Sequence, residues 1–173
     1  MGKIADVLQA RGDLDGALRI YREEELPVYE KLGDVQAKAV TMGKIADVLQ
    51  ECGDLDGALR IRREEHLPVY EKLGDVRGKA VTMGRIADVL EARGDLDGAI
   101  RGYESGVIPA LEKLGAERDL AVVRWNLAVM LRRRGRPEDL ARAEVLTEQA
   151  YEAAGRMGLP LAEEITASRR KLA

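Results

Sequence analysis

Residues 41–50 read TMGKIADVLQ, and nearly the same letters stand at 1–9 as MGKIADVLQ and at 82–90 as TMGRIADVL. Each copy carries a glycine inside a helix-like pattern, where glycine costs about 1 kcal/mol relative to alanine. The fourth equivalent position, in VRWNLAVML at 123–131, holds Trp125, the only tryptophan of the chain. The stretch therefore marks an internal repeat whose glycine needs an explanation.

The repeat has a period of 41 residues. Segments 2–42 and 43–83 align without gaps and differ at six pairs of positions. The six pairs are Ala10/Glu51, Arg11/Cys52, Tyr21/Arg62, Glu25/His66, Gln36/Arg77 and Ala37/Gly78. A third copy over 84–124 matches well as far as Arg101, and a fourth begins near Trp125. Self-similarity at a period of about 20–50 residues is typical of solenoids.

Within each copy the apolar spacing predicts two helices. In 34–53, the apolar residues fall at i, i+3, i+4 and i+7, which places them on one helix face. These residues are Met42, Ile45, Ala46 and Leu49. Gly53 is suited to end this helix and Asp54 to cap the next, which we expect over about 55–73. Gly74 and Asp75 repeat the same pair of signals.

Prolines stand inside the second helix of the first three copies, at Pro27, Pro68 and Pro109. Each removes a backbone donor and crowds the carbonyl four residues earlier, so we expect a kink. The kink either shapes the superhelix or is tolerated near an exposed helix end.

We therefore expect an all-α protein, an α-solenoid of four helix–turn–helix repeats plus a C-terminal capping helix. A solenoid of this kind buries each apolar face against the neighbouring repeat. The expected single domain covers 1–173, with repeats at 1–33, 34–74, 75–115 and 116–158 and the capping helix at 159–173.

The repeat resembles the tetratricopeptide repeat, whose pattern is a bulky residue, then L-G, then Y, then A-x3-F. The matching positions are Met42, Ile45–Ala46, Leu49 and Ala58, with Tyr21 and Tyr103 as the aromatic, and in the fourth copy NLA at 126–128, Leu131 and Gly135. Arg62 departs from the aromatic position. The period exceeds the usual 34 residues and is similar to that of kinesin light chains and Pins-like adaptors. The resemblance implies a right-handed superhelix whose first helices line a concave groove.

Polar positions beside the apolar stripe are the candidate groove residues. Asp and Gln or Glu alternate with Lys or Arg in the first three copies, and apolar residues and arginines replace them in the fourth. The candidates are Lys3, Asp6, Gln9, Gly43, Lys44, Asp47, Gln50, Gly84, Arg85, Asp88, Glu91, Trp125, Val129, Arg132 and Arg133.

Two interpretations of this stripe stay open. In the first, the glycines leave room for a peptide, the charge rows orient it and Trp125 anchors an apolar side chain. In the second, the glycines let helices pack closely, the charges bridge repeats and Trp125 packs on the terminal helix.

The sequence offers no constellation for catalysis or for a metal or cofactor. His66 and Cys52 are the only residues of their types, and neither has partners at metal-ligand or nucleophile spacing. Because their sister residues are Glu25 and Val107 for His66, and Arg11 and Arg93 for Cys52, we interpret both as surface drift. We predict that the chain is not an enzyme.

The run RRRGR at 132–136 is the strongest cluster of charge. Helix C-termini favour basic residues, which is the first interpretation. The second is that Arg132 and Arg133 meet an acidic partner. Nucleic-acid binding ranks last, since aromatic stacking partners and a wide basic face are absent and the net charge is −3.

These observations predict a protein–protein interaction scaffold that binds a peptide or partner segment, as a sensor or adaptor part of a larger signalling protein. The alternative is a self-assembling array that forms a homo-oligomer through its uncapped N-terminal face, since the first helix is about half length. A short first helix equally fits a piece of a longer array. A single cysteine, the lack of an apolar run of about 20 residues and the lack of a signal peptide favour the cytoplasm and exclude a membrane span.

Overall fold

The computed structural model describes residues 2–172, and every regular element in that range is a helix. The expected all-α fold is therefore confirmed. The chain's contacts form two compact units, residues 1–94 and 95–173, each with its own internal packing. The expected single domain and its repeat boundaries stay predictions.

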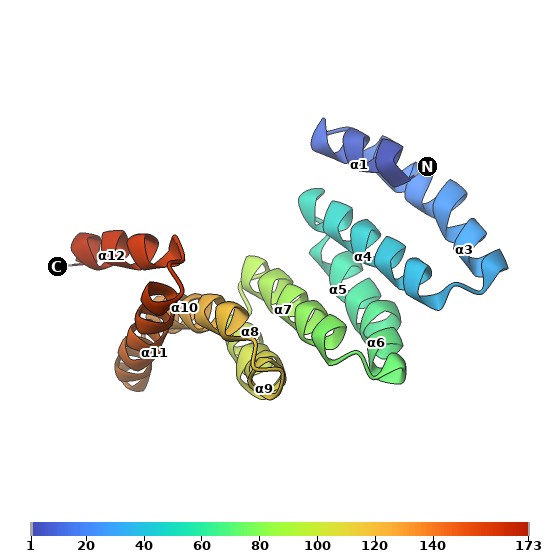
Figure 1. Ribbon diagram of the computed structural model, residues 1–173. Helices are drawn as coiled ribbons and strands as arrows, with labels where there is room; N and C mark the ends of the chain where they lie inside the picture. The colour runs from blue at the N-terminus through green and yellow to red at the C-terminus, as the bar shows by residue number, and fades with distance from the viewer. Residues whose placement is uncertain (1, 173) are drawn as a thin grey trace. The chain divides into compact units, whose positions relative to one another are not determined.

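The first unit alternates first and second helices of the repeat, and its first helices α1, α4 and α7 follow one another in space (Figure 1). Here α denotes α-helices and η denotes turns of π-helix. The elements are α1 (Gly2–Ala10), α2 (Leu14–Arg19), η1 (Ile20–Glu25), α3 (Leu26–Leu32), α4 (Val35–Glu51), α5 (Leu55–Ile61), η2 (Arg62–His66), α6 (Leu67–Leu73) and α7 (Val76–Ala92).

The second unit begins with the second helix of the third copy and ends with three longer helices. Its elements are α8 (Leu96–Gly102), η3 (Tyr103–Val107), α9 (Ile108–Lys113), α10 (Glu117–Arg134), α11 (Pro137–Arg156) and α12 (Leu161–Leu172). The helix expected at the C-terminal end of the sequence is α12.

Helices end and restart where the glycine and aspartate signals stand. Gly53 has a φ of 83°, a left-handed conformation in which a side chain would be strained. The side chain of Asp54 then accepts a hydrogen bond from the backbone N–H of Gly57 at 2.9 Å, which caps α5. The second helix predicted over about 55–73 runs from Leu55 to Leu73 as α5, η2 and α6.

Each of the three prolines follows a turn of π-helix. In the first repeat the N–H of Leu26 bonds to the carbonyl of Tyr21, five residues earlier, immediately before Pro27. Proline lacks an N–H and crowds the preceding turn of an α-helix, and a widened turn gives its ring room. The same element precedes Pro68 and Pro109, so the irregularity expected at the prolines takes the form of a π-helical turn.

The π-turns direct two side chains of each repeat into the interior. Their residues at the equivalent buried positions are Tyr21 and Glu25, Arg62 and His66, and Tyr103 and Val107. Two of the six differences between the first two repeats therefore lie at buried positions of the π-turn.

Small residues hold first and second helices close together. Ala5, Ala46 and Ala87 on the first helices, and Ala17 and Ala58 on the second, are fully buried. An alanine at these points lets two helix backbones approach, and the larger aliphatic residues fill the space on either side.

Burial of the same sequence changes along the first unit. Ile45 and Val48 on α4 are 1% and 0% exposed, and their equivalents on α7 are also buried. In α1, Ile4 and Val7 are 59% and 48% exposed. The difference arises because a preceding repeat covers α4 and α7, whereas among the described residues no repeat covers α1 in the same way.

Candidate functional site

Predicted groove residues link α1 to α4 through two polar contacts. Lys44 Nζ lies 2.7 Å from Asp6 Oδ1, and Gln9 Nε2 donates to Glu51 Oε1 at 2.7 Å. Tyr21 also donates its hydroxyl to Asp6 at 2.5 Å. The hydrogen bonds from Lys44 and then Tyr21 lower the pKa of Asp6, whereas burial, followed by the bond to Asp6, raises the pKa of Tyr21. These contacts are the bridges between repeats that the packing interpretation expects.

Arg62, the equivalent of Tyr21, contacts the aspartate of its own repeat in the same way. Its side chain is 1% exposed, and its Nη2 donates to Asp47 Oδ1 at 2.5 Å. The tyrosine–aspartate bond of the first repeat thus becomes an arginine–aspartate ion pair in the second. A paired charge is the form in which arginine tolerates burial.

Four predicted residues gather around one hollow on the face of α1, α4 and α7. The hollow has a volume of about 470 Å³ and is lined by Gln9, Asp47, Gln50, Glu51 and Arg85. The Arg85 side chain is 57% exposed. Its Nη1 lies 4.0 Å from Asp88 Oδ2, at the distance limit of an ion pair. Both signs of charge and two amides therefore face the same space.

The remaining candidates of the first unit lie along the same helices. Lys3 is exposed on α1, and Glu91 is half-buried on α7. The structure brings together the residues of the hollow and the Asp6–Lys44 pair, and it leaves Lys3 apart as an exposed side chain.

Two of the repeated glycines, Gly43 and Gly84, have different surroundings. A Cβ at residue 43 would lie 3.0 Å from His66 Cε1, which is tighter than normal packing. A Cβ at the equivalent Gly84 would meet no atom within 4 Å. A side chain at the first position would therefore press on the His66 ring, whereas one at the second would enter open space.

The interpretation of His66 as surface drift is wrong. The ring is 8% exposed, stands edge-on to Tyr70 with 5.1 Å between centroids, and places Nδ1 3.5 Å from Thr82 Oγ1. Burial, followed by the charge of Arg62, lowers the pKa of His66 to about 4. The error arose because the sister residue Glu25 is a charged residue, which suggests exposure, although Glu25 itself is 5% exposed. Cys52 is exposed, as expected.

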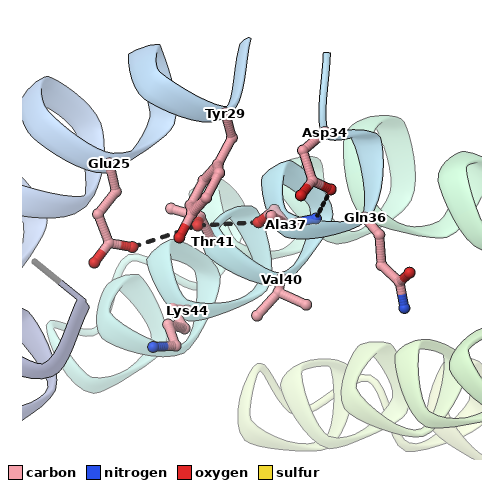
Figure 2. A pocket seen from close by; sticks show the side chains of 8 residues that line it. All are labelled: Glu25, Tyr29, Asp34, Gln36, Ala37, Val40, Thr41 and Lys44. Atoms are coloured by element: carbon pink, nitrogen blue, oxygen red, sulfur yellow. Dashed lines mark hydrogen bonds between the residues drawn. The ribbon is translucent and has the colours of Figure 1, made fainter. Parts of the chain in front are cut away.

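A pocket missed by the sequence analysis lies where η1 and α3 meet α4 (Figure 2). Its volume is about 370 Å³, and its lining residues are Glu25, Tyr29, Asp34, Gln36, Ala37, Val40, Thr41 and Lys44. Three of them, Glu25, Gln36 and Ala37, belong to the six pairs at which the first two repeats differ. The sequence showed that the two repeats diverge at these positions, but not that the positions lie together.

Trp125 lies in the interior of the second unit. It is 6% exposed and packs with Ala150 and Ile165, with Val129 and Leu161 partly buried against the same cluster. Its Nε1 donates to Glu164 at 3.2 Å. This position corresponds to the second interpretation, in which the tryptophan packs on the terminal helix α12.

The arginines of RRRGR are used largely inside the second unit. Arg132 donates to Thr147 at 2.9 Å and Glu144 at 3.1 Å. Arg134 forms a fork with the buried Asp139 at 2.7 and 2.6 Å, and this bond lowers the pKa of Asp139. Arg133 is exposed on α10. Internal pairing explains most of the run without a ligand.

Two further findings concern the described residues as a whole. No helix within 2–172 is both long and apolar enough to span a membrane. Within the same range, no three histidine, cysteine, aspartate or glutamate side chains gather as the ligands of a metal ion would.

The comparisons with known proteins agree with this geometry. The model of the tetratricopeptide repeat family matches residues 5–23 and 121–149. The structure is similar to that of BtubC (BKLC) from P. vanneervenii, with a TM-score of 0.76 and 23% identity over 88% of this chain. It is also similar to a putative kinesin light chain with nearly identical repeats from Podosopora anserina, with a TM-score of 0.58 and 14% identity over 98% of this chain and 92% of that one.

The chain spans 60% of the BtubC structure, and no curated protein matches it. Proteins built from this repeat generally mediate protein–protein interaction and are typically scaffolds rather than enzymes. Two segments of the chain match the tetratricopeptide repeat model, and the fold is similar to that of tetratricopeptide-like repeat proteins, including kinesin light chain-like repeats.

Proposed function

We propose that the chain is a protein-interaction scaffold that binds a peptide segment of a partner along the face of α1, α4 and α7. The hollow lined by Gln9, Asp47, Gln50, Glu51 and Arg85 carries this proposal. It draws on three first helices at once, so one bound segment would cross more than one repeat. We propose with it an adaptor or sensor role as part of a larger signalling protein.

The polarity of the hollow favours a segment with charged or amide side chains. Arg85 is available for an acidic group, because it is exposed and only loosely placed toward Asp88. Asp47 is less available, since its carboxylate neutralises the buried Arg62. Complementary charge of this kind sets orientation and specificity more than raw affinity. Trp125, Val129 and Arg132 are left out of the proposed surface because they pack within the second unit.

The test is a selection of random peptides against the chain, followed by affinity measurement of the selected peptides by fluorescence anisotropy. Arg85→Glu reverses the accessible charge in the hollow and is expected to weaken binding at least fivefold. Arg60→Glu is the matched control, because Arg60 is an exposed arginine on α5. Selected peptides that bind both variants as well as the original chain would contradict the proposal.

Self-assembly through α1 is the second candidate function, and the exposure of Ile4 and Val7 favours it. Their equivalents in later repeats are buried by a neighbouring repeat, so a second copy of the chain packed on α1 would bury the same kind of surface. Light scattering between 1 and 500 μM, chosen as roughly the range over which weak protein contacts form, tests this candidate. A mass that rises with concentration and stays constant for Val7→Glu supports it, and a constant monomer mass for both excludes it.

A further inference from the structure

The pocket between η1, α3 and α4 contains a buried carboxylate that lacks a full set of partners. Glu25 is 5% exposed, and its Oε1 has no hydrogen-bond partner among the described residues. Its Oε2 lies 3.4 Å from Thr41 Oγ1, but that hydroxyl also points to the carbonyl of Ala37 at 3.1 Å. One hydroxyl proton serves one of these acceptors at a time. A buried carboxylate in this state is costly unless a donor or a cation compensates it.

The lysine that lines this pocket has another partner. Lys44 Nζ lies 2.7 Å from Asp6 and 5.4 Å from the centre of the Tyr21 ring. The other acidic residue of the pocket, Asp34, accepts the backbone N–H of Ala37 at 2.9 Å and so caps α4. The pocket therefore combines an unfilled volume with excess negative charge, and Figure 2 shows Glu25, Tyr29 and Val40 around it.

The second repeat places two aromatic rings at the corresponding positions. His66 replaces Glu25, and its ring contacts Tyr70, the equivalent of Tyr29. The ring of Tyr70 also covers Gly78 so closely that a Cβ there would overlap it. The first repeat has Ala37 at that position, and its Cβ prevents Tyr29 from closing the space in the same way. The differences at 25/66 and 37/78 thus accompany a tyrosine ring that lies over this position in the second repeat, where the first repeat has a pocket.

We propose that this pocket binds the ε-ammonium of a lysine side chain of the partner segment, and the proposal rests on the peptide-binding function given above. An ammonium is a compact charge with three donors, which suits the one oxygen of the buried Glu25 carboxylate that has no partner among the described residues. An arginine fork needs two carboxylate oxygens side by side, and Oε2 already faces Thr41. The methylene stem of lysine would lie against Val40 and the ring of Tyr29, and an aromatic face also attracts a cation.

The probe for this proposal is Nα-acetyl-lysine methylamide, titrated into the full chain and followed by NMR. Its norleucine analogue carries the same stem without the charge, and its arginine analogue carries the fork. We expect the lysine probe to shift the resonances of Tyr29, Val40 and Thr41 and to bind at least tenfold more tightly than either analogue. Equal binding of the norleucine analogue would overturn the proposal.

Glu25→Gln removes the charge while keeping the shape, and we expect it to weaken the lysine probe at least tenfold. Glu30→Gln is the matched control, because Glu30 lies on α3 directly after η1, pairs with Lys38 at 2.8 Å and does not line the pocket. Probe binding that is unchanged in Glu25→Gln would overturn the proposal. So would a probe-free spectrum in which Lys44 has left Asp6 for Glu25, since the chain would then supply its own cation.

The second repeat provides a gain-of-function test that does not depend on removing a buried group. The combined variant His66→Glu, Arg77→Gln, Gly78→Ala and Arg85→Lys gives it the pocket residues of the first repeat. We expect a second probe site, with new shifts at Tyr70 and Thr82. A folded quadruple variant that still binds one probe molecule would count against the proposal.

Failure of this inference differs from failure of the proposed function. Arg60→Glu lies outside both the pocket and the hollow and is expected to leave binding of the lysine probe unchanged. If selected peptides bind the hollow of α1, α4 and α7 but the lysine probe does not bind, only the inference about Glu25 fails. If the probe binds and no peptide is selected, the pocket is an ammonium site and the proposed peptide-binding function fails.

Discussion

His66 makes the stability of the chain depend on pH. Its pKa of about 4 in the folded state lies below the ordinary value of about 6.5 that it regains on unfolding. Between these two pH values His66 is protonated in the unfolded chain and neutral in the folded chain. The free energy of unfolding therefore falls as the pH falls. The neighbouring charges, Arg62 and Asp47, act in opposite directions on this pKa, and Arg62 has the larger effect.

We therefore expect the free energy of unfolding to drop by about 2 kcal/mol more in the original chain than in His66→Val when the pH goes from 7 to 5. Valine is a suitable replacement because the third repeat has Val107 at this position. Urea denaturation of both proteins at each pH measures the difference, and subtraction removes the titration of the carboxylates they share. Parallel stability curves would show that His66 is not protonated on unfolding in this range.

Gly43 and Gly84 have the same sequence neighbours but different surroundings. Replacing a helical glycine with alanine typically stabilises by about 1 kcal/mol. Gly84→Ala is expected to gain this amount, because a Cβ there meets no atom within 4 Å. Gly43→Ala is expected to gain nothing or to lose stability, because its Cβ presses on His66 at 3.0 Å. Thermal or urea denaturation compares the two variants, and equal gains would show that the His66 ring yields freely.

At the scale of the element, the π-turn reduces the loss of stability that a proline causes inside a helix. A proline in the interior of an α-helix costs about 3 kcal/mol or more. Pro68 instead stands in the first turn of α6, directly after η2, where its ring has room and its missing N–H matters less. Most of the usual cost is therefore already avoided in the structure.

Pro68→Ala is accordingly expected to change the free energy of unfolding by less than about 1 kcal/mol. Urea denaturation measures the change, and Pro27→Ala repeats the measurement in the first repeat as an internal control. A stabilisation near 3 kcal/mol in either variant would mean that the π-turn does not relieve the proline.

The elements also show what sequence could predict. Periodicity, Gly53 and Asp54 predicted the helices and their ends because these signals act within a few residues. The π-turn at η2 was not predicted. A proline at this position is compatible with either a kink or a widened turn, and the sequence pattern does not distinguish them. The pocket at Glu25 was missed for a different reason. Its openness depends on whether the Tyr29 ring clears Ala37, and side-chain packing between two elements is not visible in a periodic pattern.

At the scale of the whole molecule, position in the array decides how stable a repeat is. α1 and α4 share the letters GKIADVLQ, yet Ile4 and Val7 are exposed where Ile45 and Val48 are buried. Local opening is easiest where few apolar contacts would be lost. We therefore expect α1 to open locally more easily than α4, although the two helices share this sequence.

Hydrogen–deuterium exchange with mass spectrometry measures this difference. Amides of α1 are expected to exchange at least tenfold faster than the equivalent amides of α4 in dilute solution. If copies assemble through α1, its protection rises with protein concentration while that of α4 stays constant. Equal protection of the two helices in a dilute monomer would show that the exposed face of α1 does not weaken it.

The contrast between an open pocket in the first repeat and a closed one in the second has a consequence for recognition. Around this pocket the two repeats differ by side chains at positions 25, 36, 37 and 44 and their equivalents, while the helical pattern of the repeat is unchanged. An array built from such repeats can carry open and closed copies in any order. Its selectivity would then depend on how the lysines of a partner are spaced along its chain, and not only on how many there are.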